Sequence, residues 1–161
     1  MEWAEILLKN IHYDPETGVF SRKRRFAPNA PAGVIDNAHD GSGHMKIRIN
    51  RKKYYAHRLA WLYMTGDWPK YDIDHINGNG MDNRWANLRD VPTMVNCQNQ
   101  KKANRANKST GLLGSHKCGR YFTATIQVKG KPIYLGNFRT AQAAHEAYIS
   151  AKRTLHEGCT I

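Results

Sequence analysis

The spacing of hydrophobic residues changes several times along the first half of the chain, and each change predicts a different element. Hydrophobic residues at near-helical spacing over 2–12 predict a short amphipathic helix. Over 44–49, Met45, Ile47 and Ile49 alternate with cations, which is typical of a strand with one buried face. The elements expected before residue 57 are a helix at 2–12, strands at 19–21 and 44–49, a hairpin turn at 50–53 and a return strand at 54–56.

The middle of the chain combines a very apolar segment with a turn-rich one. Residues 57–64 are apolar on nearly every side, which predicts a helix buried at the centre of a domain. Strands are expected at 71–77 and 88–91, separated by a loop rich in Gly and Asn. Thr93 is a suitable N-cap for a following helix at 94–102.

The C-terminal part of the chain returns to a regular pattern after a polar interruption. Residues 103–110 are polar, basic and aperiodic, as expected for an interdomain linker. Residues 121–128 alternate between apolar and polar side chains, and a further strand is expected at 133–136. An Ala-rich helix at 140–155 offers a flat face that can pack on this sheet.

Together these elements predict an α+β protein with two domains. The first domain is expected over 1–102, with N-terminal strands within 1–56 and a core over 57–102. The second domain, 111–161, is expected to be a small three-stranded antiparallel sheet with one packed helix. The linker at 103–110 joins the two.

The charge of the chain narrows the class of partner. The net charge is +12 and the isoelectric point is about 9.8, and no Asp or Glu occurs from Val91 to His145. Such one-sided segments follow phosphate backbones, so nucleic acid is the first candidate, beside the alternative of a merely basic protein. The cations expected to contact phosphates are Arg51, Lys52, Lys53, Lys101, Lys102, Arg105, Lys117 and Arg120.

The cysteines and the N-terminus exclude several other classes. Cys97, Cys118 and Cys159 are isolated from one another, so neither a disulfide framework nor a structural zinc site is expected. Acidic residues stand where a signal peptide needs positive charge, and the apolar runs are too short to span a bilayer. We therefore expect an intracellular, cytoplasmic protein that does not bind membranes.

The stretch Ile73-Asp74-His75-Ile76-Asn77-Gly78-Asn79 has the composition of a site. The Asp74 carboxylate and the Asn96 amide are oxygen donors suited to Mg²⁺ or Mn²⁺, and the His75 imidazole can deprotonate water near neutral pH. Together they indicate metal-assisted hydrolysis of a phosphodiester. For each residue taken alone, a turn-forming or packing role is the alternative. Adjacent strand residues point to opposite faces, so Asp74 and His75 reach one pocket only through twist or a bulge.

Residues 54–99 closely resemble the HNH homing endonucleases of bacteriophages, whose nuclease core is a ββα-metal motif. The resemblance implies that His75 is the general base, that Asp74 and Asn96 bind one divalent metal, and that Asn87 braces the loop and orients His75. The role of His57 stays open between an ordered buried histidine and a phosphate contact. The matching segments are Ala56-His57-Arg58-Leu59-Ala60-Trp61, Asp74-His75-Ile76-Asn77-Gly78-Asn79, Asp82-Asn83-Arg84, Asn87-Leu88-Arg89 and Asn96.

Residues 111–157 are similar to the ethylene-response-factor type of DNA-binding domain, in which a three-stranded sheet enters the major groove. The similarity rests on Phe122, Ala124 and Ile126, on Tyr134-Leu135-Gly136-Asn137-Phe138 and on the Ala141–Tyr148 segment. It implies that the outward side chains of the sheet touch DNA. By alternation these are Tyr121, Thr123, Thr125, Gln127 and Tyr134.

The sequence is thus expected to encode a phage-type, metal-dependent DNA endonuclease in a bacterial host. It would act as a monomer on double-stranded DNA, and one site of this kind nicks one strand. The main alternative is a DNA-binding regulator with a decayed nuclease core. A weaker alternative is a structural or RNA-binding accessory protein.

Overall fold

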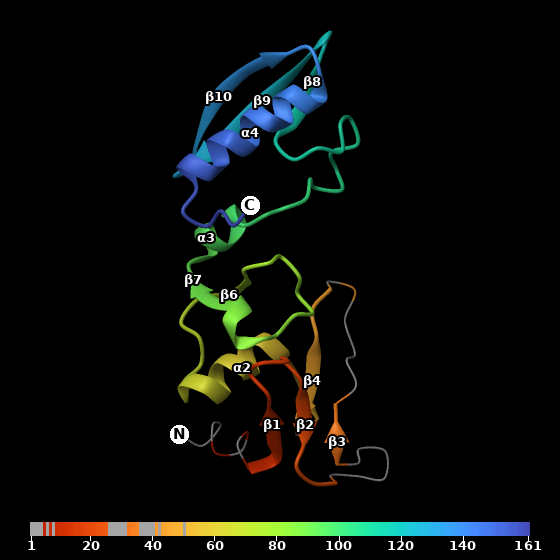
Figure 1. The fold of residues 1–161 in the computed structure, drawn as a ribbon, viewed down its shortest axis with the longest axis vertical. Coiled ribbons are helices and arrows are strands. Elements are labelled where there is room, and N and C mark those ends of the chain that lie inside the picture. Colours follow the sequence, from red (N-terminus) through yellow and green to blue (C-terminus); the bar gives the residue numbers. More distant parts are fainter. Residues whose placement is uncertain are drawn as a thin grey trace. The chain divides into compact units, whose positions relative to one another are not determined.

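The chain forms two compact units, Met1–Pro92 and Thr93–Ile161, drawn as ribbons in Figure 1. The computed structural model describes residues 5, 7, 9–25, 32–35, 41, 43–49 and 51–161. The division between the units comes earlier in the chain than the predicted linker at 103–110. Among the residues with described structure, none of the helices is long and apolar enough to cross a membrane.

The described N-terminal part of the first unit, up to β5, forms two small sheets. Strands β1, β2 and β3 form one antiparallel sheet, and β4 pairs with β5 in the other. Met45, Ile47 and Ile49 are all buried, which confirms the predicted alternation in this segment. The strands are Ile11–Tyr13 (β1), Phe20–Arg22 (β2), Gly33–Val34 (β3), Lys46–Ile49 (β4) and Lys52–Tyr55 (β5).

The helix predicted at 2–12 is shorter than the sequence pattern indicated. Glu5, Leu7, Lys9 and Asn10 are helical, whereas the remaining positions before Lys9 lie outside the described residues. Ile11 is the first residue of β1, because its backbone pairs with Arg22 of β2. Pairing with a strand distant in sequence therefore overrides the helical spacing at this end.

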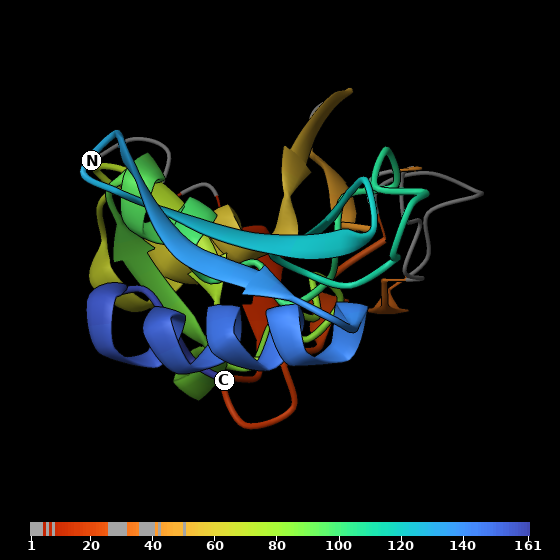
Figure 2. The same ribbon diagram turned by 90° about the horizontal axis from the view of Figure 1, so that it is seen from above.

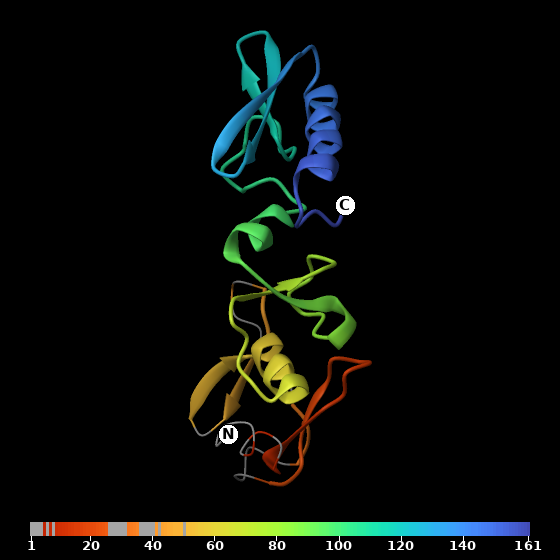
Figure 3. The same ribbon diagram turned by 90° about the vertical axis from the view of Figure 1, so that its left-hand side faces the viewer.

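Helix α2, Ala56–Thr65, follows β5 directly and lies beside the β4–β5 hairpin (Figure 3). Its nearly all-round apolar character predicted burial at the centre of the domain, but Met64 is 40% exposed and Trp61 and Tyr63 are only partly buried. One face of the helix therefore carries the packing. The helix ends at Gly66, whose φ of 83° is in the left-handed region that closes helices.

The next elements form the second half of this unit. Strands β6 (Asp72–His75) and β7 (Leu88–Val91) pair antiparallel, with Asp74 opposite Arg89 and His75 opposite Leu88. A short 3₁₀ helix, Trp85–Asn87, precedes β7. The two predicted strands are thus present. Ile73 and Leu88 join the core formed by the N-terminal strands and α2, so this core fixes one face of the β6–β7 pair.

The second unit begins with helix α3, Thr93–Gln98. The segment after α3 is bound to the C-terminal tail. The backbone N–H of Gly158 donates to Gln98 Oε1 at 3.0 Å, and the buried Lys152 ammonium donates to the backbone carbonyl of Gln100. The helix predicted at 94–102 therefore ends at Gln98, where the chain turns to meet this tail.

A three-stranded sheet and helix α4 complete the second unit. The strand order is β10-β9-β8, and both neighbouring pairs are antiparallel. Helix α4 runs along one face of the sheet (Figure 2), and the Thr140 side chain caps it by accepting from the Ala143 N–H at 3.1 Å. The bounds are Ser115–Cys118 (β8), Tyr121–Val128 (β9), Lys131–Phe138 (β10) and Ala141–Leu155 (α4).

Candidate active site

His75 is the last residue of β6 and is only 5% exposed. Because side chains alternate along a strand, His75 shares a face with Ile73, which belongs to the core. Its cross-strand partner Leu88 is in the same core. The imidazole is therefore held against the apolar centre of the first unit rather than in solvent.

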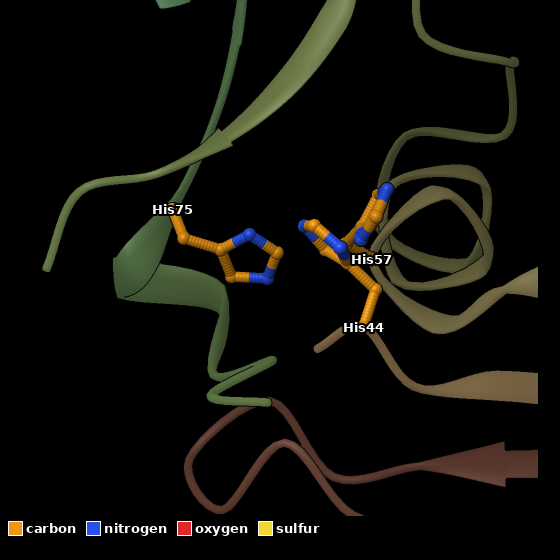
Figure 4. A group of neighbouring side chains, drawn as sticks. All are labelled: His44, His57 and His75. Atoms are coloured by element: carbon orange, nitrogen blue, oxygen red, sulfur yellow. The ribbon is translucent and has the colours of Figure 1, made fainter. Parts of the chain in front are cut away.

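Two further histidines lie next to His75 in space. His44 precedes β4 and His57 lies in the first turn of α2, and the three rings point toward one another (Figure 4). The ring centroid of His75 is 5.1 Å from that of His57 and 5.7 Å from that of His44. One nitrogen from each ring lies within 4.8 Å of the other two. No chemistry was expected of His44 from the sequence.

Burial favours the neutral form of His57 and of His75. Burial, followed by repulsion from the neighbouring His75 and His44, lowers the pKa of His57 from 6.5 to about 3. Burial also lowers the pKa of His75, although a hydrogen bond to Asn83 acts in the opposite direction. A neutral imidazole can either accept a proton or ligate a metal, so near neutral pH both roles are chemically open.

Asn83 holds His75 from the loop between β6 and β7. Asn83 is 2% exposed, and its Oδ1 lies 3.4 Å from His75 Nε2. The Asn83 amide donates to the Met81 carbonyl at 3.3 Å, and its own backbone carbonyl accepts from the Tyr13 hydroxyl at 2.7 Å. With the amide N–H directed at Met81, Oδ1 acts as an acceptor, which places the proton of His75 on Nε2.

Asp74 has a different partner from its neighbour. Arg89 lies directly across the strand pair, and its Nε and guanidinium NH2 lie 2.8 and 2.7 Å from Asp74 Oδ2. Asp74 is 5% exposed, so this ion pair compensates a buried carboxylate. The side chains of Asp74 and His75 therefore leave β6 on opposite faces, the difficulty that the sequence had raised.

Asn87 ties the loop after β6 to β7. Its Oδ1 accepts from the Asn77 N–H at 2.9 Å, and its amide donates to the Asp82 carbonyl at 2.7 Å. Asp82 in turn accepts two bonds from the Arg84 side chain, at 2.8 and 2.6 Å. These contacts suit the bracing role that the resemblance implied for Asn87, and its part in catalysis stays a prediction.

The remaining predicted site residues belong to several parts of the chain. Asn96 is in α3 of the second unit and is half-buried. Arg51, Lys52 and Lys53 are exposed in the β4–β5 hairpin, where Arg51 has a φ of 66°. In the second unit, Lys101 is half-buried, and its ammonium lies 3.4 Å from the Thr160 carbonyl. The other cations predicted to contact phosphates there are exposed, namely Lys102, Arg105, Lys117 and Arg120.

The outward residues of β9 and β10 are not all equally accessible. Tyr121 and Tyr134 are 51% and 61% exposed, whereas Thr123 is partly covered and donates to Asn137 Oδ1 on β10 at 2.7 Å. Thr125 and Gln127 line a cavity of about 590 Å³ within the second unit. The alternation predicted from the sequence is present, with Ala124 and Ile126 buried on the opposite face.

A comparison with protein families gives a match over part of the chain. Residues 54–96 match the family described as HNH endonuclease, a segment that contains Asp74, His75 and Asn87 and ends at Asn96. The match supports an HNH nuclease, a class that generally uses divalent metals and acts on DNA. No curated protein and no solved structure matches the chain significantly.

Sequence reasoning missed three partners of the predicted site residues. The missed residues are His44, Asn83 and Arg89, each of which contacts Asp74 or His75. Asn83 and Arg89 lie in segments that resemble the nuclease family, whereas His44 does not. The sequence alone gave none of them a role. For Arg89, the signal was present, because a residue opposite a strand carboxylate is a natural ion-pair partner. For His44 no local signal exists, since His44 and His75 are far apart in the sequence and meet only in the folded unit.

Proposed function

We propose that this protein is a metal-dependent DNA endonuclease of the homing type, which acts as a monomer and nicks one strand at each site. The observation that carries the proposal is the environment of His75. His75 is a buried, neutral imidazole held by an asparagine inside the segment that matches the HNH endonuclease family. This combination supports a general base for attack of water on phosphate.

His75 would remove the proton from the attacking water. Its Nε2 lies beside Asn83 Oδ1, so the basic lone pair is on Nδ1. The Tyr13 hydroxyl donates to the backbone carbonyl of Asn83, and this contact would help to keep the His75 ring in one orientation. Burial excludes bulk water from competing for the imidazole, and a base of this kind typically contributes about 10²–10⁴-fold to the rate.

The donor set also fits the metal that this class of nuclease uses. The Asp74 carboxylate and the Asn96 amide offer the hard oxygen ligands that Mg²⁺ and Mn²⁺ prefer. The ion pair with Arg89 is compatible with this role, because it compensates the charge of the buried carboxylate. A divalent ion bound there would supply Lewis-acid stabilisation of the charge that develops on the phosphate. Asn87 would keep the loop in register beside this site.

The second unit would bind the DNA. Its sheet exposes Tyr121 and Tyr134, and the cations Lys117 and Arg120 lie at the turn between β8 and β9. No acid from Val91 to His145 opposes an approaching phosphate backbone. Phosphate contacts of this kind position a protein on DNA, whereas the aromatic and polar strand residues would contact the bases.

Cleavage of supercoiled plasmid tests the proposal. With Mg²⁺ or Mn²⁺ we expect wild type to convert supercoiled plasmid to the open-circular form, and a chelator to stop the reaction. His75→Ala should lower the rate by about 10²-fold or more. His12→Ala, which removes an exposed histidine of β1, is the matched control and should cut like wild type.

Two results would overturn the nuclease assignment. One is equal nicking by wild type and His75→Ala, which would point to a contaminating enzyme. The other is salt-sensitive binding to DNA without any metal-dependent cleavage by wild type, which is the behaviour of a regulator with a decayed nuclease core.

A further inference from the structure

We propose that His44, His57 and His75 form a site for a zinc-like transition-metal ion, and that an ion bound there inhibits the nuclease. The metal-binding part depends only on the three histidines. The inhibition rests on the proposed function, because it assumes that His75 is the general base.

The spacing of the three imidazoles suits a single ion. One nitrogen from each lies within 4.8 Å of the other two. Around a tetrahedral zinc with bonds of about 2.0–2.1 Å, neighbouring nitrogens are roughly 3.3 Å apart. Small rotations of the rings would therefore bring all three nitrogens into coordination, and three histidines are a known ligand set for zinc with an open fourth position.

His57 provides an independent indication of a ligand. Its side chain is 8% exposed, and its Nδ1 has no hydrogen-bond partner although the atom is buried. A buried nitrogen without a partner is costly, and such atoms in folded proteins generally have a reason. Figure 4 shows the His57 ring beside His44 and facing His75, so a metal between the rings would satisfy it.

The surroundings keep the three ligands in place without the metal. The His44 ring lies edge-on to His57, with centroids 5.4 Å apart, and the Tyr55 ring stacks on His57 at 5.2 Å. Asn83 Oδ1 lies beside the second nitrogen of His75, which is how metal-binding histidines are usually oriented. A Cβ at Gly80 would come within 2.8 Å of His44 Cδ2, so a glycine leaves room for this ring.

The chemistry distinguishes this site from that proposed for the catalytic metal. Neutral imidazoles favour zinc, copper or nickel, whereas carboxylate and amide oxygens favour Mg²⁺ or Mn²⁺. The histidines gather on the face of β6 that meets the core, and Asp74 projects from the opposite face toward Arg89. The chain thus offers two donor sets that prefer different ions.

Occupancy of the histidine site would remove the base. A metal coordinated to His75 takes the same lone pair that would accept the proton of water. Inhibition should therefore occur while Mg²⁺ is saturating, because Mg²⁺ is a poor competitor for imidazole. The inference gives His44 and His57 a role in regulation without placing them in the hydrolytic reaction.

Direct binding tests the site without reference to activity. The full chain, stripped with a chelator, is titrated with Zn²⁺ against a chromogenic chelator and with Co²⁺ by visible absorption. The background carries Cys97→Ser, Cys118→Ser and Cys159→Ser, so that thiolates do not contribute. We expect one equivalent of Zn²⁺ to bind and a Co²⁺ spectrum typical of nitrogen and oxygen ligands. His44→Ala and His57→Ala should each weaken binding by about tenfold or more, whereas His12→Ala should not.

Circular dichroism identifies variants that fail to fold. Because His44 is only half-buried, whereas His57 and His75 are buried, His44→Ala should disturb folding least. Absence of stoichiometric binding to wild type would overturn the inference, and so would equal affinity in wild type and a folded His44→Ala variant.

Plasmid cleavage then tests the inhibition, with each variant compared with its own rate in Mg²⁺ alone. The zinc concentration that halves the rate should rise by about tenfold or more in His44→Ala. An unchanged value would overturn the inhibitory role. Failure of wild type to cleave at all would instead refute the proposed function, and the binding titration would still decide whether the histidines hold a metal.

Discussion

The two units bury different kinds of polar side chain. In the described part of the first unit, most buried polar residues belong to α2, β6 and the segment between β6 and β7, namely His57, Asp74, His75, Asn83 and Asn87, whereas Asn10 is buried just before β1. In the second unit, the buried polar residues Asn99, Ser115 and Lys152 are dispersed, and the outward face of the sheet exposes Tyr121 and Tyr134. Catalytic groups gain from removal of water, whereas groups that bind DNA must be reachable.

The largest expected effects on stability come from substituting one tightly packed glycine in each unit. A Cβ at Gly18 would lie 2.6 Å from the backbone of Asn83 and Arg84, and one at Gly114 would lie 1.9 Å from the Tyr148 ring. Both glycines have positive φ. Gly18→Ala should destabilise the first unit and Gly114→Ala the second, each by about 2 kcal/mol or more.

Hydrogen exchange, followed separately in the two units, measures which unit each substitution destabilises. Gly130→Ala is the control, because Gly130 has positive φ but an added Cβ there would meet open space. This substitution should cost only about 1–2 kcal/mol. If either tight glycine variant loosened both units equally, the division of the chain into independent units would be wrong.

A smaller loss of stability is expected when Asn87, which ties the loop after β6 to β7, is replaced. Asn87→Ala removes hydrogen bonds to the Asn77 N–H and the Asp82 carbonyl, so we expect a loss of about 1–3 kcal/mol. Plasmid cleavage should fall while DNA affinity stays near that of wild type. Chemical denaturation and filter binding measure the two properties. Asn79→Ala, at an exposed loop position, is the control, and an equal effect there would remove the special role of Asn87.

In the second unit the expected change is in affinity rather than stability. Lys117→Ala combined with Arg120→Ala should weaken DNA binding and reduce its salt dependence by about one counterion for each phosphate that is no longer bound. Cleavage at saturating protein should be unaffected, because neither residue lies in the unit that contains His75. Lys70→Ala in the first unit is the control. An unchanged salt slope in the double variant would place the DNA elsewhere.

The smallest expected effect depends on pH. The Arg84 guanidinium beside Asp82 lowers the pKa of that carboxyl from 3.8 to about 2. Since the folded-state value is the lower one, the pair stabilises the loop above pH 3.8, and this contribution is lost as the pH falls toward 2. Thermal unfolding of Asp82→Asn against pH should show a flatter acid limb than wild type. Parallel curves would mean that the pair contributes nothing to stability.

The sequence predicted regular elements well where the pattern is local. The alternation in β9 and the helix near 140–155 appear as expected, because burial of one face is enough to define each. The helix at 2–12 was predicted too long, because the pairing of Ile11 with Arg22 is not visible in its own spacing. The histidine cluster was missed for the same reason, as His44 meets His75 only after β4 and β6 have packed on one core.

The hydrogen bond from Tyr13 to Asn83 connects residues 70 positions apart in the chain. Since Asn83 also contacts His75, the orientation of that imidazole depends on a contact of very long range. Contacts of this kind form late in folding, because the chain between them must first be ordered. A refolding chain would therefore form the sheet of the second unit before the site around His75 was assembled, so the proposed cleavage activity would appear only with the completed fold.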